Sequence, residues 1–345
     1  MNRLVVLRSG PVSARVDLVS LVTGSIAWVL TFAVAAVSLT LGDYEIPLAD
    51  VLNTLAGNGS LIMTDVVVNS RLPRVLVGMG VGAAFAISGA IFQRLARNPL
   101  VSPDLIGINA GAALAAVVMI TVLGSGAGWI PVGALLGSLS TATIIYLLAY
   151  RRGVAGYRLV LVGIGITAMA GAATSYLLTL ADIYTAKSAS LWLAGSLSGR
   201  TWAHAALMGG TLLVVVPLAV GLSRQLRLLE LGDDLARTLA GRVELARGLL
   251  ILAGVALAAL ATAAAGPIGF VALVAPQITR RLLAERVIGL LTSGAIGALL
   301  VVVSDLVARQ IFAPTTLPVG IVTAFLGAPY LLILMARANR VGRGG

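Results

Sequence analysis

The sequence contains a series of apolar runs, most of them long enough to cross a lipid bilayer. From Gly248 to Thr279, for example, 32 consecutive residues carry no charged side chain. The hydrocarbon core of a bilayer is about 30 Å thick, so an α-helix needs about 20 apolar residues to cross it. Only helices and closed barrels satisfy their backbone hydrogen bonds in lipid, and runs of this length predict a helical membrane protein.

The composition excludes a soluble protein. Hydrophobic residues make up 59% of the 345 residues and charged residues 11%, and the mean hydropathy is +1.03. So few charges do not cover the surface of a soluble protein of this size. The net charge of +11 does not indicate nucleic-acid binding, because the arginines lie in short clusters between the apolar runs.

The apolar runs predict an all-α, polytopic protein with about ten transmembrane helices in a single domain, residues 1–345. The first run follows a basic N-terminal segment, residues 1–17, but it is too long for a signal peptide and is expected to be retained. The expected spans lie at about 18–41, 72–93, 105–123, 129–150, 159–181, 203–222, 248–265, 268–279, 287–308 and 318–336.

The count depends on whether 248–279 forms one long helix or two helices. The pair Gly266-Pro267 favours two, since proline breaks the helix ladder. With two helices, every basic residue except five falls on one face of the membrane, which the positive-inside rule makes cytoplasmic. Both termini and residues 1–17 are then cytoplasmic. The five exceptions are Arg71, Arg74, Lys187, Arg200 and Arg309.

The residues of an enzyme are missing. The chain has no cysteine, and His204 is its only histidine, next to Trp202 at a span boundary. Lys187, the only lysine, follows Ala186, so no phosphate-binding loop of the type G-x-x-x-x-G-K-[ST] exists. We expect no catalytic site, no metal site and no cofactor on this chain; ATP, if it drives the protein, binds to a partner. A proton-coupled carrier acting alone is the alternative, although few ionisable groups lie within the spans.

Three connecting segments carry polar or charged residues. In 98–112, cytoplasmic in our topology, two prolines and Gly107 break the helix, and irregular backbone at membrane depth lines a cavity or is buried in protein. This segment is either a pathway or gate, or a plain tight connection.

In the cytoplasmic loop 223–247, leucines recur at helical spacing and form either a solvated helix or a docking surface for a partner. On the outer face, Arg71 and Arg74 flank the entrance to the second span. Arg309 ends the ninth, four residues after Asp305. These arginines either reach lipid headgroups or dock a partner.

Several stretches resemble a known family, the type II ABC importer permeases (FecCD-like), which import iron–siderophore complexes, haem and vitamin B12. The resemblance covers roughly residues 18–337 and rests on RLPRVLVGMGVGAAFAISGAIFQRLARNPLVSPDLIGINAGA, GPIGFVALVAPQITRR and LPVGIVTAFLGAPYL. The stretches YRLVLVGIGI and LLELGDDLARTLAG are similar to the ferric-siderophore branch, and to ferric-enterobactin permeases in particular. One departure is Gln277, where the family usually has histidine; transport needs no catalytic histidine, so we expect no loss.

The resemblance implies a permease subunit of the cytoplasmic (inner) membrane that moves an iron–siderophore cargo inward by alternating access. It implies a second permease, like or identical, two ATPase subunits that bind ATP and magnesium, and an extracytoplasmic binding protein, with lipid around the subunit and no nucleic acid. The alternative cargo is cobalamin or haem. The implied sites are binding-protein docking by Arg71, Arg74 and Arg309; ATPase coupling by Leu231, Gly232, Asp233, Asp234, Leu235, Arg237 and Leu239; and a pathway or gate at Asn98, Pro99, Ser102, Asp104 and Asn109.

Overall fold

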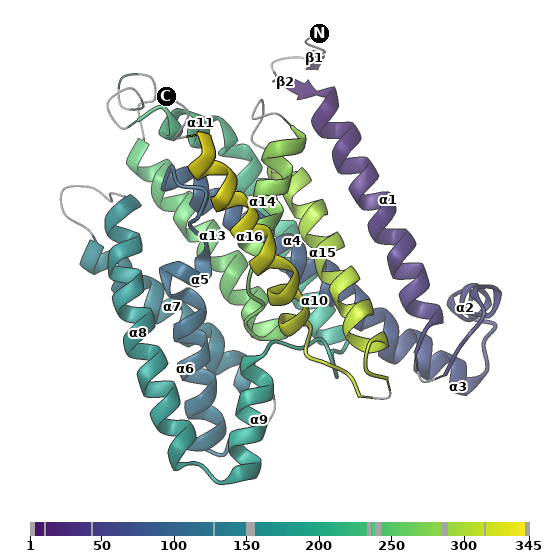
Figure 1. Ribbon diagram of the computed structural model, residues 1–345. Coiled ribbons are helices and arrows are strands. Elements are labelled where there is room, and N and C mark those ends of the chain that lie inside the picture. Colours follow the sequence, from purple (N-terminus) through teal and green to yellow (C-terminus); the bar gives the residue numbers. More distant parts are fainter. Residues whose placement is uncertain are drawn as a thin grey trace.

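The structure is a computed structural model of the chain. It describes residues 4–9, 12–42, 44–126, 128–149, 156–232, 236, 238, 243–283, 289–313 and 315–341. Within these ranges the protein is a bundle of helices preceded by one short antiparallel hairpin, in which Leu4 pairs with Asp17 (Figure 1). The hairpin is β1 (Leu4–Ser9) and β2 (Val12–Asp17). The all-α prediction is thus confirmed for the bundle and did not include this hairpin.

The helices follow one another closely along the chain. The first half contains α1 (Leu18–Thr40), α2 (Leu48–Leu55), α3 (Leu61–Thr64), the π-helix η1 (Asp65–Arg71), α4 (Leu72–Leu95), α5 (Pro103–Ile106), α6 (Ile108–Thr121) and α7 (Ile130–Ala149). The second half contains α8 (Gly156–Leu180), α9 (Ile183–Leu193), α10 (Trp202–Gly221), α11 (Ser223–Glu230), α13 (Val243–Ala265), α14 (Val271–Leu282), α15 (Leu290–Gln310) and α16 (Val319–Val341).

Each of the ten expected spans coincides with a helix. Seven helical stretches of the described chain are long and apolar enough to cross a membrane: α1, the continuous helix Leu61–Leu95, α7, α8, α10, α13 and α15. The other three are shorter, since α6 has 14 residues, α14 has 12, and α16 is apolar over Val319–Ile333. The multi-pass helical architecture is therefore confirmed, and the count of ten crossings stays a prediction.

The uncharged run from Gly248 to Thr279 is broken where the sequence predicts. Helix α13 ends at Ala265 and α14 begins at Val271. Between them Gly266 has φ +77°, a left-handed conformation that favours glycine, and Pro267 follows. The start of α1, the end of α16 and α11 lie at one end of the bundle, and α2, α3 and α9 lie at the other (Figure 1). This arrangement agrees with both ends of the chain being on one side.

Helix α4 is the centre of the bundle, and nineteen of its 24 residues are buried. It contacts α15, α13, α14 and α10. Gly82 packs on the backbone of Gly297 in α15, and Gly89 packs on the backbone of Ala272 in α14; a β-carbon at either position would collide with a carbonyl group. Small residues thus let the helices approach closely where lipid provides no hydrophobic driving force. This close packing holds α4 against α14 and α15, and the candidate site residues lie at its two ends.

Candidate functional site

The outer end of α4 carries Arg71 and Arg74. Helix η1 widens the helical turn just before α4 and ends at Arg71, whose side chain is only 8% exposed. Its Nη1 donates to the Leu39 carbonyl at 2.7 Å, and its Nη2 donates to the Tyr44 carbonyl. Leu39 belongs to the last turn of α1, where carbonyl groups lack partners within the helix. Arg71 therefore caps α1 and fixes it to α4.

Asp305 of α15 joins the other two arginines. Arg74 binds it in a bidentate pair, with Nε 3.1 Å from both carboxylate oxygens and Nη2 2.8 Å from Oδ1. Arg309 lies one turn further along α15, with its Nε 3.4 Å from Asp305 Oδ2. It also donates through Nη2 to the hydroxyl of Ser38 and through Nη1 to the carbonyl of Leu41 at 3.4 Å. The side chains of Arg74, Arg309 and Asp305 are 15%, 9% and 3% exposed.

The structure thus brings the three predicted docking arginines into one group, the outer arginine cluster (Arg71, Arg74, Arg309 and Asp305). Sequence reasoning placed Asp305 only beside Arg309 and missed its stronger pair with Arg74. A lone carboxylate in an apolar helix was the available signal, because it requires a buried counter-charge. The cluster has three arginines for one aspartate, so its net charge is positive. Its guanidinium groups bind partners within the chain, and a docking role stays a prediction.

At the cytoplasmic end, the five predicted gate residues lie in one compact segment that runs from the end of α4 through α5 into the first turn of α6. Asn98 accepts from the backbone of Leu100 at 2.9 Å, and Ser102 caps the N-terminus of the short helix α5. Gly107, at φ +94°, joins α5 to α6 in a left-handed conformation. This segment, residues 98–109, is called the gate segment below.

Two neighbouring helices hold the gate segment. Gln277 of α14 donates through Nε2 to the Pro99 carbonyl at 2.9 Å and to Gln93 Oε1 at 2.6 Å. Asn109 donates to the carboxylate of Asp104 and accepts from the Thr262 hydroxyl of α13 at 2.8 Å. Ser102 and Asn109 are buried, whereas Asn98 is exposed. Gln277 therefore acts as a hydrogen-bond donor to the gate segment. The sequence did not indicate this role.

Asp104 lies in α5, outside the helices that are long enough to span. Burial raises the pKa of its carboxyl group to about 7. Asn109 is the only side chain of the described residues that donates a hydrogen bond to it. The gate segment therefore contains a carboxyl group that changes its charge close to neutral pH.

The cytoplasmic coupling residues are only partly described. Asp233, Asp234, Leu235, Arg237 and Leu239 lie outside the described residues. In the described part, α11 buries Leu226 and Leu229, while Leu231 is 60% exposed and Gly232 has φ +111°. Helix α13 is described from Val243, five residues before the predicted span, and Glu244 and Arg247 pair at 3.2 Å on its first turns.

One ion pair joins this region to the end of α4. Arg94 Nη1 lies 2.6 Å from Glu230 Oε1 at the end of α11. Arg94 precedes the gate segment by four residues, so α11 and the gate segment are attached to the same helix end. The sequence placed both charged residues on the cytoplasmic face but did not pair them.

The single histidine has a structural role at the opposite end. His204 lies in the first turn of α10, where its Nδ1 accepts a hydrogen bond from the backbone of Thr201 at 3.3 Å. The Thr201 side chain in turn accepts from the backbone of this turn, which completes a capping box. His204 thus stabilises a helix start at a span boundary.

An apolar bundle of spanning helices, with its charged and irregular segments gathered at the two ends, defines a multi-pass membrane protein. The profile of the FecCD transport family matches residues 30–337, and the chain belongs to that family.

Two curated relatives illustrate the similarity. The chain is 44% identical to the ferric enterobactin transport system permease protein FepG of Escherichia coli (strain K12), over 87% of this chain and 91% of that protein. It is 39% identical to the achromobactin transport system permease protein CbrC of Dickeya dadantii (strain 3937), over 98% of this chain and 97% of that protein.

A solved structure shares the fold. It is an inward-facing conformation of a metal-chelate type ABC transporter, with a TM-score of 0.81 and 27% identity, and the match covers 91% of this chain and 98% of that one. The chain is therefore a permease of the ABC importer family that serves siderophores, iron chelates and haem, a multi-pass protein of the cytoplasmic membrane.

Proposed function

We propose that this permease carries a ferric siderophore similar to ferric enterobactin into the cytoplasm. The observation that carries the proposal is the 44% identity to the ferric enterobactin permease over 87% of the chain. The stretches YRLVLVGIGI and LLELGDDLARTLAG point to the same branch. Membership of an ABC transporter family favours ATP-driven import over the proton-coupled alternative.

The proposal includes partners. A second permease, like or identical, completes the pathway, two ATPase subunits bind ATP and magnesium, and a binding protein delivers the cargo to the outer face. This chain itself is expected to bind no cofactor and to make no bonds. The outer arginine cluster supports docking through its net positive charge, because opposite charges steer two proteins together over roughly a Debye length of 8 Å.

We place the ATPase contact at α11 and the residues that follow it, from Leu231 to Leu239. Leu231 supports this placement because it is a large apolar side chain that is 60% exposed beyond the end of a cytoplasmic helix. Motion of α11 is transmitted to α4 by the pair of Arg94 and Glu230. From α4 it reaches the gate segment, which Gln277 and Thr262 hold by hydrogen bonds.

The test is reconstitution of the purified complex in liposomes, with uptake of labelled ferric enterobactin, haem and cobalamin measured side by side. Uptake of the ferric siderophore that needs ATP and the binding protein is the expected result. Preferred uptake of haem or cobalamin would show that the proposed cargo is wrong, and the ATP-driven mechanism would stand. Uptake driven by a proton gradient without ATP would overturn the mechanism itself.

A further inference from the structure

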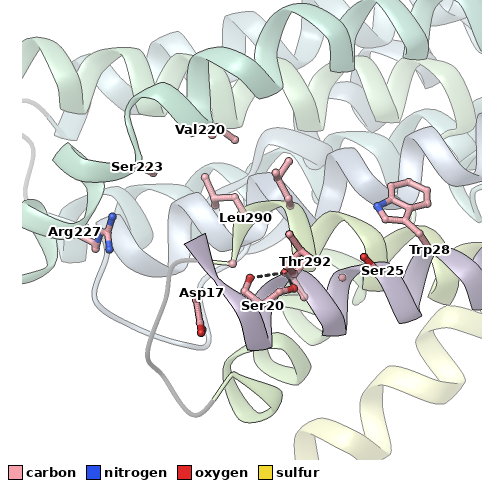
Figure 2. Close-up of a pocket in the computed structure, with 13 residues that line it drawn as sticks. Asp17, Ser20, Ser25, Trp28, Val220, Ser223, Arg227, Leu290 and Thr292 are labelled. Atoms are coloured by element: carbon pink, nitrogen blue, oxygen red, sulfur yellow. Dashed lines mark hydrogen bonds between the residues drawn. The ribbon is translucent and has the colours of Figure 1, made fainter. Parts of the chain in front are cut away.

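A cavity of about 460 Å³ lies beside α1 near the cytoplasmic end of the bundle. Its walls come from the first turns of α1, the junction of α10 and α11, and the start of α15 (Figure 2). Helix α1 packs mainly on α15, which leaves this space open between α1 and α10. Nothing in the transport mechanism above uses it.

The cavity has a charged end and an apolar end. Asp17 and Arg227 lie near its cytoplasmic end, and Trp28 lies at the opposite end, deeper along α1 (Figure 2). Between them, Ser20 and Thr292 share a hydrogen bond of 3.0 Å. Leu21 and Leu291 also line the cavity and are 53% and 58% exposed, so the cavity opens on the surface of the bundle. Along the cavity, charged residues are followed by polar and then apolar ones. A phospholipid has the same order, from its charged headgroup to its acyl chains.

The two charged residues indicate which headgroup fits. Arg227 is exposed, and a guanidinium group binds phosphate through charge-assisted hydrogen bonds. Asp17 is 9% exposed and caps α1 by accepting from the backbone of Val19 with Oδ1. Its Oδ2 is buried and has no hydrogen-bond partner among the described residues. A buried carboxylate oxygen calls for a donor or a cation, which an ammonium group supplies.

We propose that this cavity binds one phospholipid of the cytoplasmic leaflet with an amine headgroup, of the phosphatidylethanolamine type. The phosphate lies at Arg227, the ammonium group at Asp17, and one acyl chain along Leu21 toward Trp28. The depth agrees with this occupant, because Asp17 directly precedes the first membrane helix. A bound lipid here fills the gap that separates α1 from α10.

The test is native mass spectrometry of the purified, delipidated complex with added lipid. Wild-type protein should retain phosphatidylethanolamine more tightly than phosphatidylglycerol, whose headgroup has no ammonium group for Asp17. Arg227→Ala should weaken retention about tenfold through loss of a charge-assisted phosphate contact. Arg224→Ala is the matched control, since Arg224 is an exposed arginine of the same helix that does not line the cavity. Asp17→Asn keeps the helix cap and should remove the preference between the two lipids.

Four other results would contradict the proposal. Equal retention of both lipids by wild type would overturn the amine headgroup, and equal losses in the two arginine variants would show ordinary surface lipid. Competition by inorganic phosphate alone would identify an anion site without an acyl chain. No lipid retained at all, in a complex whose thermal unfolding is unchanged, would mean that a neighbouring subunit covers the cavity.

Discussion

Arg74 and Asp305, 231 residues apart in sequence, form a bidentate ion pair that joins the outer ends of α4 and α15. Asp305 also contacts Arg309, which in turn reaches the end of α1. One carboxylate therefore balances two largely buried guanidinium groups. Three helices meet at this point, and one carboxylate is the counter-charge for both arginines.

Asp305→Asn should destabilise the protein strongly. It leaves Arg74 and Arg309 without a counter-charge, and loss of one partner from a buried ion pair costs about 3–5 kcal/mol. Thermal unfolding of the purified protein measures the loss. Asp65→Asn is the control, because Asp65 is an exposed carboxylate near the same end of the bundle. Equal stability of the two variants would show that Asp305 contributes no more than a surface charge.

Docking of the binding protein should depend on the outer arginine cluster more than on the overall charge of the outer face. Arg309→Gln retains an amide that donates to the end of α1, and Arg74 still pairs with Asp305, so the fold should persist. We expect affinity to fall about threefold at low salt, as for a partly screened charge pair. Affinity for wild type should also fall as salt rises.

Lys187→Gln provides the comparison for docking, since Lys187 is an exposed cation of α9 on the same face. Surface plasmon resonance with the reconstituted complex gives both affinities. If the two variants weaken binding equally, only net charge matters. If neither does, the arginines serve the fold alone.

The sequence predicts much of the fold because hydropathy and the breaks at Gly266-Pro267 are local properties. It does not predict the pairs that hold the ends together. Arg74 and Asp305 lie far apart in the chain, and so do Gln277 and Pro99; only the packing of α4 against α14 and α15 brings them into contact. The short span predicted at 268–279 has the length of α14, which is 12 residues. The shortness of α6 was not apparent, because the apolar residues of α5 and of the turn after α6 extend the run at both ends.

Leu231→Asp should separate the permease from its ATPase. The side chain is exposed, so the fold should tolerate the change, whereas a charge buried in a protein contact typically costs a few kcal/mol. Leu231→Met keeps an apolar side chain at the same position and serves as the control. The measurement is the amount of ATPase that co-purifies with each variant. Normal co-purification of the aspartate variant would exclude Leu231 from the contact.

Breaking the pair of Arg94 and Glu230 should uncouple ATP hydrolysis from transport. Glu230→Gln removes the charge and keeps the shape, so we expect ATPase binding and hydrolysis to continue while uptake falls about tenfold, roughly 1.4 kcal/mol of coupling. The exchanged double variant, Arg94→Glu with Glu230→Arg, should recover part of the uptake. A loss of hydrolysis together with uptake would indicate a damaged ATPase contact instead, and absence of any recovery would argue against the pair as the link.

Stability should depend on pH through Asp104 in the gate segment, because burial raises the pKa of its carboxyl group to about 7. In the unfolded chain the carboxyl group has its ordinary value near 3.8, so between these values the folded protein holds a proton that the unfolded chain has lost. Stability therefore falls as pH rises through this window and levels off above about 7, where both states are ionised. Between pH 5 and pH 8 the loss from this group should be about 1–3 kcal/mol. Asp104→Asn has nearly the same shape and no titration, and its unfolding temperature should lack this decline while other pH effects remain. Thermal unfolding of both proteins from pH 5 to pH 8 gives the comparison, and parallel curves would show that Asp104 is ionised throughout and is solvated in the assembled protein.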